Sequence, residues 1–151
     1  MLETQNIPFY QKTSGSCRAS LSETEINIGL SKKACDYSNK LAIESIKKIN
    51  PTLIVIAQAN GHEEQDWVKM SNEISSIVDS KVILVGPVSQ WQPSLPKVII
   101  KAKNWNTSDQ MISDIGLDLN IINTDEIMNK QNTHDAYEYI SVISKLCKKD
   151  N

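Results

Sequence analysis

Apolar residues along the chain alternate between strand-like runs and helical spacing. Two continuous apolar runs, 53–57 and 82–85, have the length of strands that are buried on both faces, as in parallel sheets. Apolar residues three and four positions apart predict helices over 33–49 and 63–78. A last strand is expected over 139–142, so the order predicts alternating strands and helices.

Other segments are less regular. Residues 7–10 could form a short strand, and 98–100 fit either a helix or a strand. Residues 102–123 have the pattern of a long irregular connection with some helix. Thr124 is expected to cap a helix over 125–136, because acidic residues follow it and suit a first turn.

This alternation predicts an α/β fold, with a parallel sheet covered by helices on both faces, in a single domain over 1–151. Ligands of such sheets bind at the carboxyl ends of the strands. The loops of interest are therefore 11–17, 57–66 and 86–96.

Composition and motifs argue against several classes of protein, which include nucleic-acid-binding, metal-binding and membrane-spanning proteins. The chain has 151 residues and a net charge of −2, which gives no electrostatic case for nucleic acid. No phosphate-binding or dinucleotide motif is present and no His/Cys cluster has metal-ligand spacing, so neither a cofactor nor a metal is expected. No apolar run has the length of a membrane span and no signal peptide opens the chain, so the sequence as written predicts a cytoplasmic protein.

Three residues near the strand ends, and one at the end of a predicted helix, are candidates for chemistry. Asn60 follows a predicted buried strand and could donate its amide to an oxyanion, although Asn-Gly is equally a favoured turn pair. His62 precedes acidic residues and is interpreted first as a solvated loop histidine, with a catalytic role as the alternative. Trp91 either covers the core or lines a pocket, and cover is favoured. His134 is expected at an exposed helix end.

Several segments resemble blocks of bacterial SGNH domains. These domains are fused to acyltransferase-3 membrane O-acyltransferases, which modify lipopolysaccharide O-antigen and related glycans. Residues 7–17 resemble the second block, and Cys35 with Asn39 followed by 51–58 resembles the next. The most specific match is 82–91, with the sequence VILVGPVSQW. Residues Tyr139-Ile140-Ser141 with Leu146-Cys147 resemble the segment before the closing block.

The resemblance implies a three-layer α/β/α fold, SGNH/flavodoxin-like, and an acyl-transfer or esterase chemistry. The family uses a serine in a Gly-Asp-Ser block and a later Asp-x-x-His block, and neither occurs here. The chain is therefore expected to be a fragment truncated at both ends, incomplete as a fold and inactive alone. By position, Asn60 matches the third-block asparagine and Ser16 the second-block oxyanion donor. Gly15, His62 and Trp91 are the residues of a possible pocket.

The resemblance also implies partners and a compartment. An acyl donor and a glycan acceptor would be the substrates, a membrane acyltransferase domain would lie upstream, and the parent domain would be periplasmic. The three cysteines by themselves leave open whether all are reduced or one pair forms. The resemblance implies that Cys17 pairs with Cys35, and that Cys147 pairs with a cysteine beyond the end.

Two other readings stay open. One is a non-catalytic binding or interaction module that keeps a glycan-sized cleft. The other is an unrelated enzyme that uses His62 with a local acid. Because loss of a central strand leaves backbone groups unpaired, a marginally stable or homo-oligomeric product is expected.

Overall fold

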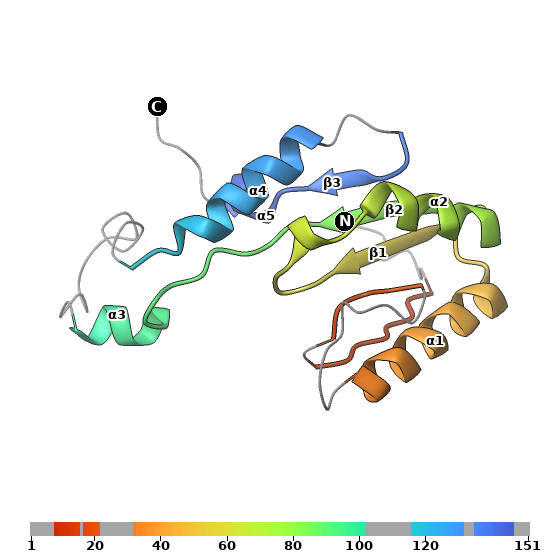
Figure 1. Cartoon of the computed structure of the whole chain (residues 1–151), viewed down its shortest axis with the longest axis horizontal. Helices are drawn as coiled ribbons and strands as arrows, with labels where there is room; N and C mark the ends of the chain where they lie inside the picture. The colour runs from red at the N-terminus through yellow and green to blue at the C-terminus, as the bar shows by residue number, and fades with distance from the viewer. Residues whose placement is uncertain (1–7, 16, 22–31, 102–115, 132–134, 147–151) are drawn as a thin grey trace, which may run out of the picture. The chain divides into compact units, whose positions relative to one another are not determined.

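A computed structural model describes most of the chain, and its elements are drawn in Figure 1. The described residues are 8–15, 17–21, 32–101, 116–131 and 135–146. The chain divides into two compact units, Met1–Asn50 and Pro51–Asn151. The single domain expected over 1–151 stays a prediction.

The described part of the first unit contains one helix, α1, over Lys32–Ile49, which confirms the helix predicted there. The helix ends where Asn50 takes a left-handed conformation, with φ of 48°, and its amide donates to the Ile46 carbonyl at 2.9 Å. Pro51 follows and disfavours a further helical turn. Residues 8–10 carry no strand, and Ile7 lies outside the described residues.

A disulfide ties the polar loop of this unit to α1. Cys17 and Cys35 are bonded, with their Cα atoms 5.3 Å apart, and Cys35 is fully buried. The Asn39 side-chain amide donates to the Arg18 carbonyl at 3.1 Å, one turn along the helix. The Cys17–Cys35 pairing that the resemblance implied is therefore confirmed. Cys147 lies outside the described residues.

The second unit is built on a parallel sheet of three strands, which lie side by side in Figure 1. The strands are β1 (Leu53–Ala57), β2 (Lys81–Val85) and β3 (Glu138–Ile140), in that order. The register places Ile56 opposite Leu84, and Leu84 opposite Tyr139. The predicted α/β class with a parallel sheet is confirmed.

Burial along the strands differs from the expectation for β1. In β2, Val82 and Leu84 are almost fully buried. In β1, Leu53 and Val55 are 46% and 57% exposed, so the prediction of burial on both faces is wrong for this strand. Exposure alternates along the strand, because Leu53 and Val55 lie on one face of the sheet and the half-buried Ile54 and Ile56 lie on the other. A strand is buried on both faces only where both faces of the sheet are covered.

The helix predicted over 63–78 is interrupted. A short 3-10 helix, η2, covers His62–Glu64, and α2 begins at Trp67 and ends at Ile77. Asp66 stands between them as the N-cap, and its carboxylate accepts from the Lys69 amide at 2.9 Å. This side-chain cap makes a new start to the helix, which apolar spacing alone does not reveal.

The later helices settle three sequence expectations. The alternative at 98–100 resolves as a helix, α3, over Leu95–Lys101. The cap expected at Thr124 is wrong, because α4 covers Leu119–Gln131 and Asp118 accepts from the Asn120 amide at its start. The last strand ends at Ile140, and α5 covers Val142–Leu146, so the strand predicted to Val142 is too long.

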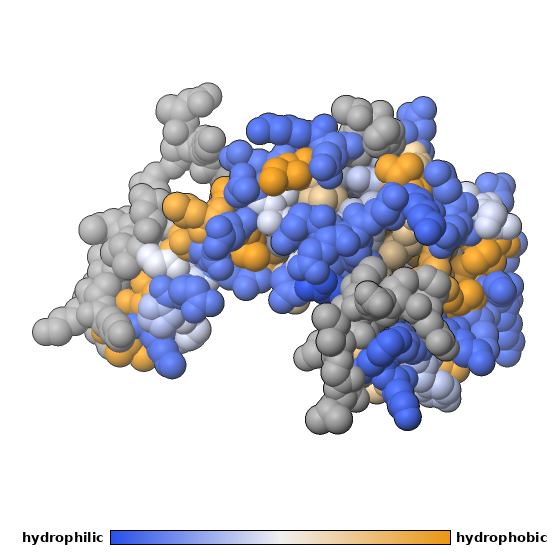
Figure 2. Space-filling view, in the orientation of Figure 1, coloured by the Kyte–Doolittle hydropathy of each residue, from blue (hydrophilic) through white to orange (hydrophobic). Residues whose placement is uncertain are grey.

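Residues 102–115 and 132–134, which include His134, lie outside the described part. The core of the second unit lies among the sheet, α2 and α4. Its most buried apolar residues are Trp67, Ile74, Val82, Leu84, Val98, Met128 and Tyr139. Figure 2 shows apolar side chains that also reach the surface among the polar ones. None of the helices in the described ranges combines the length and apolar character needed to cross a membrane.

Candidate functional site at the carboxyl ends of the strands

The turn after β1 places Asn60 at the carboxyl end of that strand. Its backbone is held on both sides, because Gln90 donates to the Ala59 carbonyl at 3.2 Å and Gln58 donates to the Asn60 carbonyl at 3.0 Å. Gly61 follows in a left-handed conformation, with φ of 71° and ψ of 27°, which favours glycine. Asn60 itself is exposed and forms an Asn-Gly turn with Gly61, and its role as an oxyanion donor stays a prediction.

His62 is buried, with no exposed surface, so its interpretation as a solvated loop histidine is wrong. Its Nε2 lies 3.2 Å from the carbonyl of Val85, the last residue of β2. Its own carbonyl accepts from the indole Nε1 of Trp67 at 2.7 Å. Burial lowers the pKa of His62, and the hydrogen bond to Val85 and the charges of Glu63 and Asp125 partly oppose this shift. The physical reason for its burial is that the short 3-10 helix turns the ring inward instead of leaving it in the loop.

A buried polar network lies beside His62, and the sequence analysis did not single it out. Asp125 of α4 is 4% exposed and accepts two hydrogen bonds, one on each carboxyl oxygen. Tyr139 donates to Oδ1 at 2.7 Å and Ser141 donates to Oδ2 at 2.6 Å. Ser141 also accepts from the Ser144 amide at 2.9 Å, as an N-cap of α5.

A sequence signal for this network does exist. Tyr139 and Ser141 are two positions apart at the end of an apolar strand, so their side chains share one face of the sheet. A buried hydroxyl needs a hydrogen-bond partner, but the sequence does not say that Asp125 supplies it. Burial raises the pKa of Tyr139, and its hydrogen bond to Asp125 adds to this shift.

Among the other candidate residues, Trp91 directly follows Gln90, whose side chain donates to the Ala59 carbonyl in the Asn60 turn. Trp91 is half-buried and its backbone forms an antiparallel bridge with that of Leu117, and whether its side chain covers the core or lines a pocket stays a prediction. Gly15 is exposed and belongs to the first unit, whereas Asn60, His62 and Trp91 belong to the second. Ser16 lies outside the described residues, so its oxyanion role stays a prediction.

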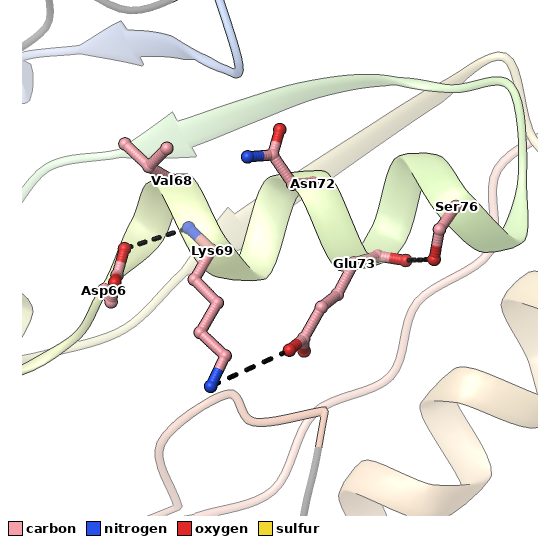
Figure 3. Close-up of a pocket in the computed structure, with 6 residues that line it drawn as sticks. All are labelled: Asp66, Val68, Lys69, Asn72, Glu73 and Ser76. Atoms are coloured by element: carbon pink, nitrogen blue, oxygen red, sulfur yellow. Dashed lines mark hydrogen bonds and ion pairs between the residues drawn. The ribbon is translucent and has the colours of Figure 1, made fainter.

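A surface hollow lies away from these strand ends. It is lined by residues of α2 and its cap, which Figure 3 shows as sticks: Asp66, Val68, Lys69, Asn72, Glu73 and Ser76. Its polar side chains bond within the helix, with Lys69 4.0 Å from Glu73 and Ser76 donating to the Glu73 carbonyl. None of the candidate residues lines it.

The described residues at the strand ends include one buried histidine and one exposed asparagine. Within the described ranges, His62 is the one histidine, and its Nε2 is bonded to a backbone carbonyl, not to a nucleophile. The described residues also contain no group of three His, Cys, Asp or Glu side chains that could hold a metal ion. The exposed amide of Asn60 on its fixed turn is the group that could contact a ligand.

Comparisons with known proteins identify a structural neighbour. No protein-family model and no curated protein matches the chain. A solved structure, the periplasmic domain of a lipopolysaccharide acetyltransferase from Salmonella ser. Paratyphi A, matches with a TM-score of 0.63 and 23% sequence identity. The match covers 78% of this chain and 49% of that one, so this chain spans about half the length of its neighbour. The two share an α/β fold.

Proposed function

We propose that this chain is part of an SGNH-type domain that acts on acyl groups of cell-surface glycans, such as lipopolysaccharide O-antigen, in the periplasm. The observation that carries the proposal is the Asn60 amide, exposed on a fixed turn at the carboxyl end of a parallel strand. This is where the SGNH resemblance puts an oxyanion donor. The likeness in fold to the periplasmic domain of a lipopolysaccharide acetyltransferase supports the same assignment.

The physical role of Asn60 would be to donate to the ester carbonyl oxygen, on which negative charge develops. Donors stabilise such charge best when they are already in place before the reaction. The two hydrogen bonds to the carbonyls of Ala59 and Asn60 hold the backbone that carries the Asn60 side chain. Ser16 would be a second donor, by its position in the resemblance.

In this proposal the serine nucleophile and the Asp-x-x-His pair lie in polypeptide outside residues 1–151. The acyl donor, the glycan acceptor and a membrane acyltransferase domain are the proposed partners. The chain alone would then bind an acylated glycan without hydrolysing it. The buried His62 supports this, because its Nε2 bonds to Val85 and has no nucleophile beside it.

The same observation favours a second candidate, a non-catalytic binding module. Among the described residues, the one histidine has its Nε2 bonded to a backbone carbonyl and not available as a general base. The two candidates agree on binding by this chain. They differ in whether a longer natural polypeptide that contains residues 1–151 catalyses acyl transfer or ester hydrolysis.

The test measures binding and turnover separately. Saturation-transfer NMR with an O-acetylated methyl glucoside, and with the same glucoside lacking the acetyl group, reports whether the chain recognises the ester. We expect binding of the acetylated sugar that Asn60→Ala weakens about tenfold, the loss of roughly one hydrogen bond. Asn72→Ala, at an exposed position of α2, is the matched control and should bind normally. Equal binding of both sugars, or no effect of Asn60→Ala, would contradict the proposal.

Turnover is measured by hydrolysis of p-nitrophenyl acetate against a heat-killed control. We expect no turnover above that control by residues 1–151. Turnover that Asn60→Ala abolishes would overturn the inactive assignment. Turnover that survives Asn60→Ala but is lost in His62→Ala would favour the unrelated enzyme that uses His62.

A further inference from the structure

His62 is placed two residues after Asn60 and is fully buried, which separates it from the ligand-facing side of the turn. We propose that His62 is a positioning residue, which as the neutral Nε2–H tautomer clamps the Asn60 turn to the end of β2 and takes no part in proton transfer. The inference rests on the proposed function of the Asn60 turn, and it assigns the role of a neighbouring residue.

The tautomer follows from the partner of the ring. The Val85 carbonyl can only accept a hydrogen bond, so the Nε2 that lies 3.2 Å from it must carry the hydrogen. Nδ1 is then unprotonated, and no hydrogen-bond partner for it exists among the described residues. Protonation would put a second N–H at that buried position, where it has no acceptor.

The charges around the ring are few. Glu63 on the same 3-10 helix and Asp125 on α4, which packs against that helix, are the acidic groups that act on it. Their attraction for a proton is outweighed by burial, which lowers the pKa of His62. The neutral ring is therefore the form that the fold selects at neutral pH.

The clamp connects three elements at one residue. The ring bonds to the last residue of β2, and the His62 carbonyl accepts from the indole of Trp67 at the start of α2. Gly61, buried and left-handed, is the one residue between this clamp and Asn60. A shift of the His62 ring would therefore move the Asn60 turn. The single N–H of the neutral ring already donates to the Val85 carbonyl and is not available to a ligand.

The first test needs no ligand and no variant. The imidazole 15N chemical shifts of His62 in the whole chain report its tautomer. We expect an Nε2–H ring at pH 7. A ring protonated at Nδ1 alone would leave Nε2 unable to donate to Val85 and would overturn the proposal.

The second test uses two substitutions that separate hydrogen bonding from proton transfer. The amide nitrogen of Gln falls near the place of Nε2, so H62Q can still donate to Val85 but cannot act as a base. H62F fills space without a donor. We expect the Gly61 amide and Asn60 side-chain amide resonances to stay near their wild-type positions in H62Q and to move or broaden in H62F. The same displacement in both variants, or none in either, would overturn the clamp.

The third test asks whether His62 acts through Asn60. Binding of the O-acetylated methyl glucoside is measured for wild type, H62F, Asn60→Ala and the double variant. If His62 only positions Asn60, the double variant binds no more weakly than Asn60→Ala alone. Additive losses would mean that His62 affects the ligand independently, against the proposal. If the wild-type chain does not bind the sugar, the proposed function is wrong. The tautomer of His62 and the resonance shifts of the variants would still test whether His62 holds the Asn60 turn.

Discussion

The hydroxyl of Tyr139 donates to Oδ1 of Asp125 at 2.7 Å, directly beside the backbone of Gly86. A Cβ at Gly86 would clash with the hydroxyl oxygen of Tyr139 and would lie 2.9 Å from Oδ1 of Asp125. The end of β2 thus leaves just enough room for a hydrogen bond between β3 and α4. Gly86 is needed for this close approach and not for an unusual backbone conformation.

Gly86→Ala should therefore separate Tyr139 from Asp125. Overpacking of this kind typically costs about 1–3 kcal/mol, and the lost hydrogen bond places the expected loss near the upper end. Urea unfolding followed by circular dichroism measures the change. Gly15→Ala is the matched control, because a Cβ there meets no atom within 4 Å. Equal stability of the two variants would contradict the close approach.

Asp125→Ala should be strongly destabilising, because it removes the acceptor of two buried hydroxyls. Leaving a buried donor unsatisfied costs roughly 1–3 kcal/mol per group, so we expect a loss of about 3 kcal/mol in the free energy of unfolding. Asp79→Ala, at an exposed position, should change stability little. If Asp125→Ala and Tyr139→Phe combined cost as much as the sum of the single changes, the two side chains are not coupled.

The stability of the chain should fall with acid in a range set by His62. Its folded pKa lies below the ordinary 6.5, so between these two values the unfolded chain binds a proton that the folded chain does not. The contribution of His62 is thus complete above pH 6.5, declines as the pH falls below it, and levels off below the folded pKa. Urea unfolding of wild type and H62Q, from pH 7.5 downward, gives the free energy of unfolding of each as a function of pH. The difference between the two curves is the contribution of His62. Parallel curves would contradict a buried neutral His62.

Reduction of Cys17–Cys35 should destabilise the first unit. The bond joins residues separated by 18 positions, for which the chain-entropy model gives about 3 kcal/mol. The loss of stability is measured by thermal unfolding with and without reductant. The measurement compares wild type with the double variant Cys17→Ser, Cys35→Ser. Reductant should lower the melting temperature of wild type and leave that of the double variant unchanged. The Cys147→Ser variant, which keeps this bond, should respond to reductant as wild type does.

Self-association should occur through β1. Its apolar residues Leu53 and Val55 are substantially exposed, and an edge strand with exposed apolar side chains invites pairing with another chain. Light scattering after size exclusion should give a mass that rises with concentration. Val55→Lys should reduce this rise, whereas Ser75→Lys on an exposed position of α2 should not. A wild-type monomer at every concentration would contradict the prediction.

The alternation of strands and helices was predictable from local patterns. The runs at 53–57 and 82–85 became β1 and β2, and the helical spacing at 33–49 became α1. Capping was harder to predict, because Asp66 and Asp118 act through single hydrogen bonds that apolar spacing does not register. Thr124 had the sequence context of a cap but lies within α4, where the start of the helix was set elsewhere.

The sequence by itself determined the order of the elements and the turn at Asn60-Gly61, since periodicity and turn chemistry are local properties of the chain. Only the tertiary structure decided that His62 is buried and that Asp125 receives the hydroxyls of Tyr139 and Ser141. The physical reason is that burial and hydrogen-bond partnership depend on residues far apart in sequence, which the sheet and α4 bring together.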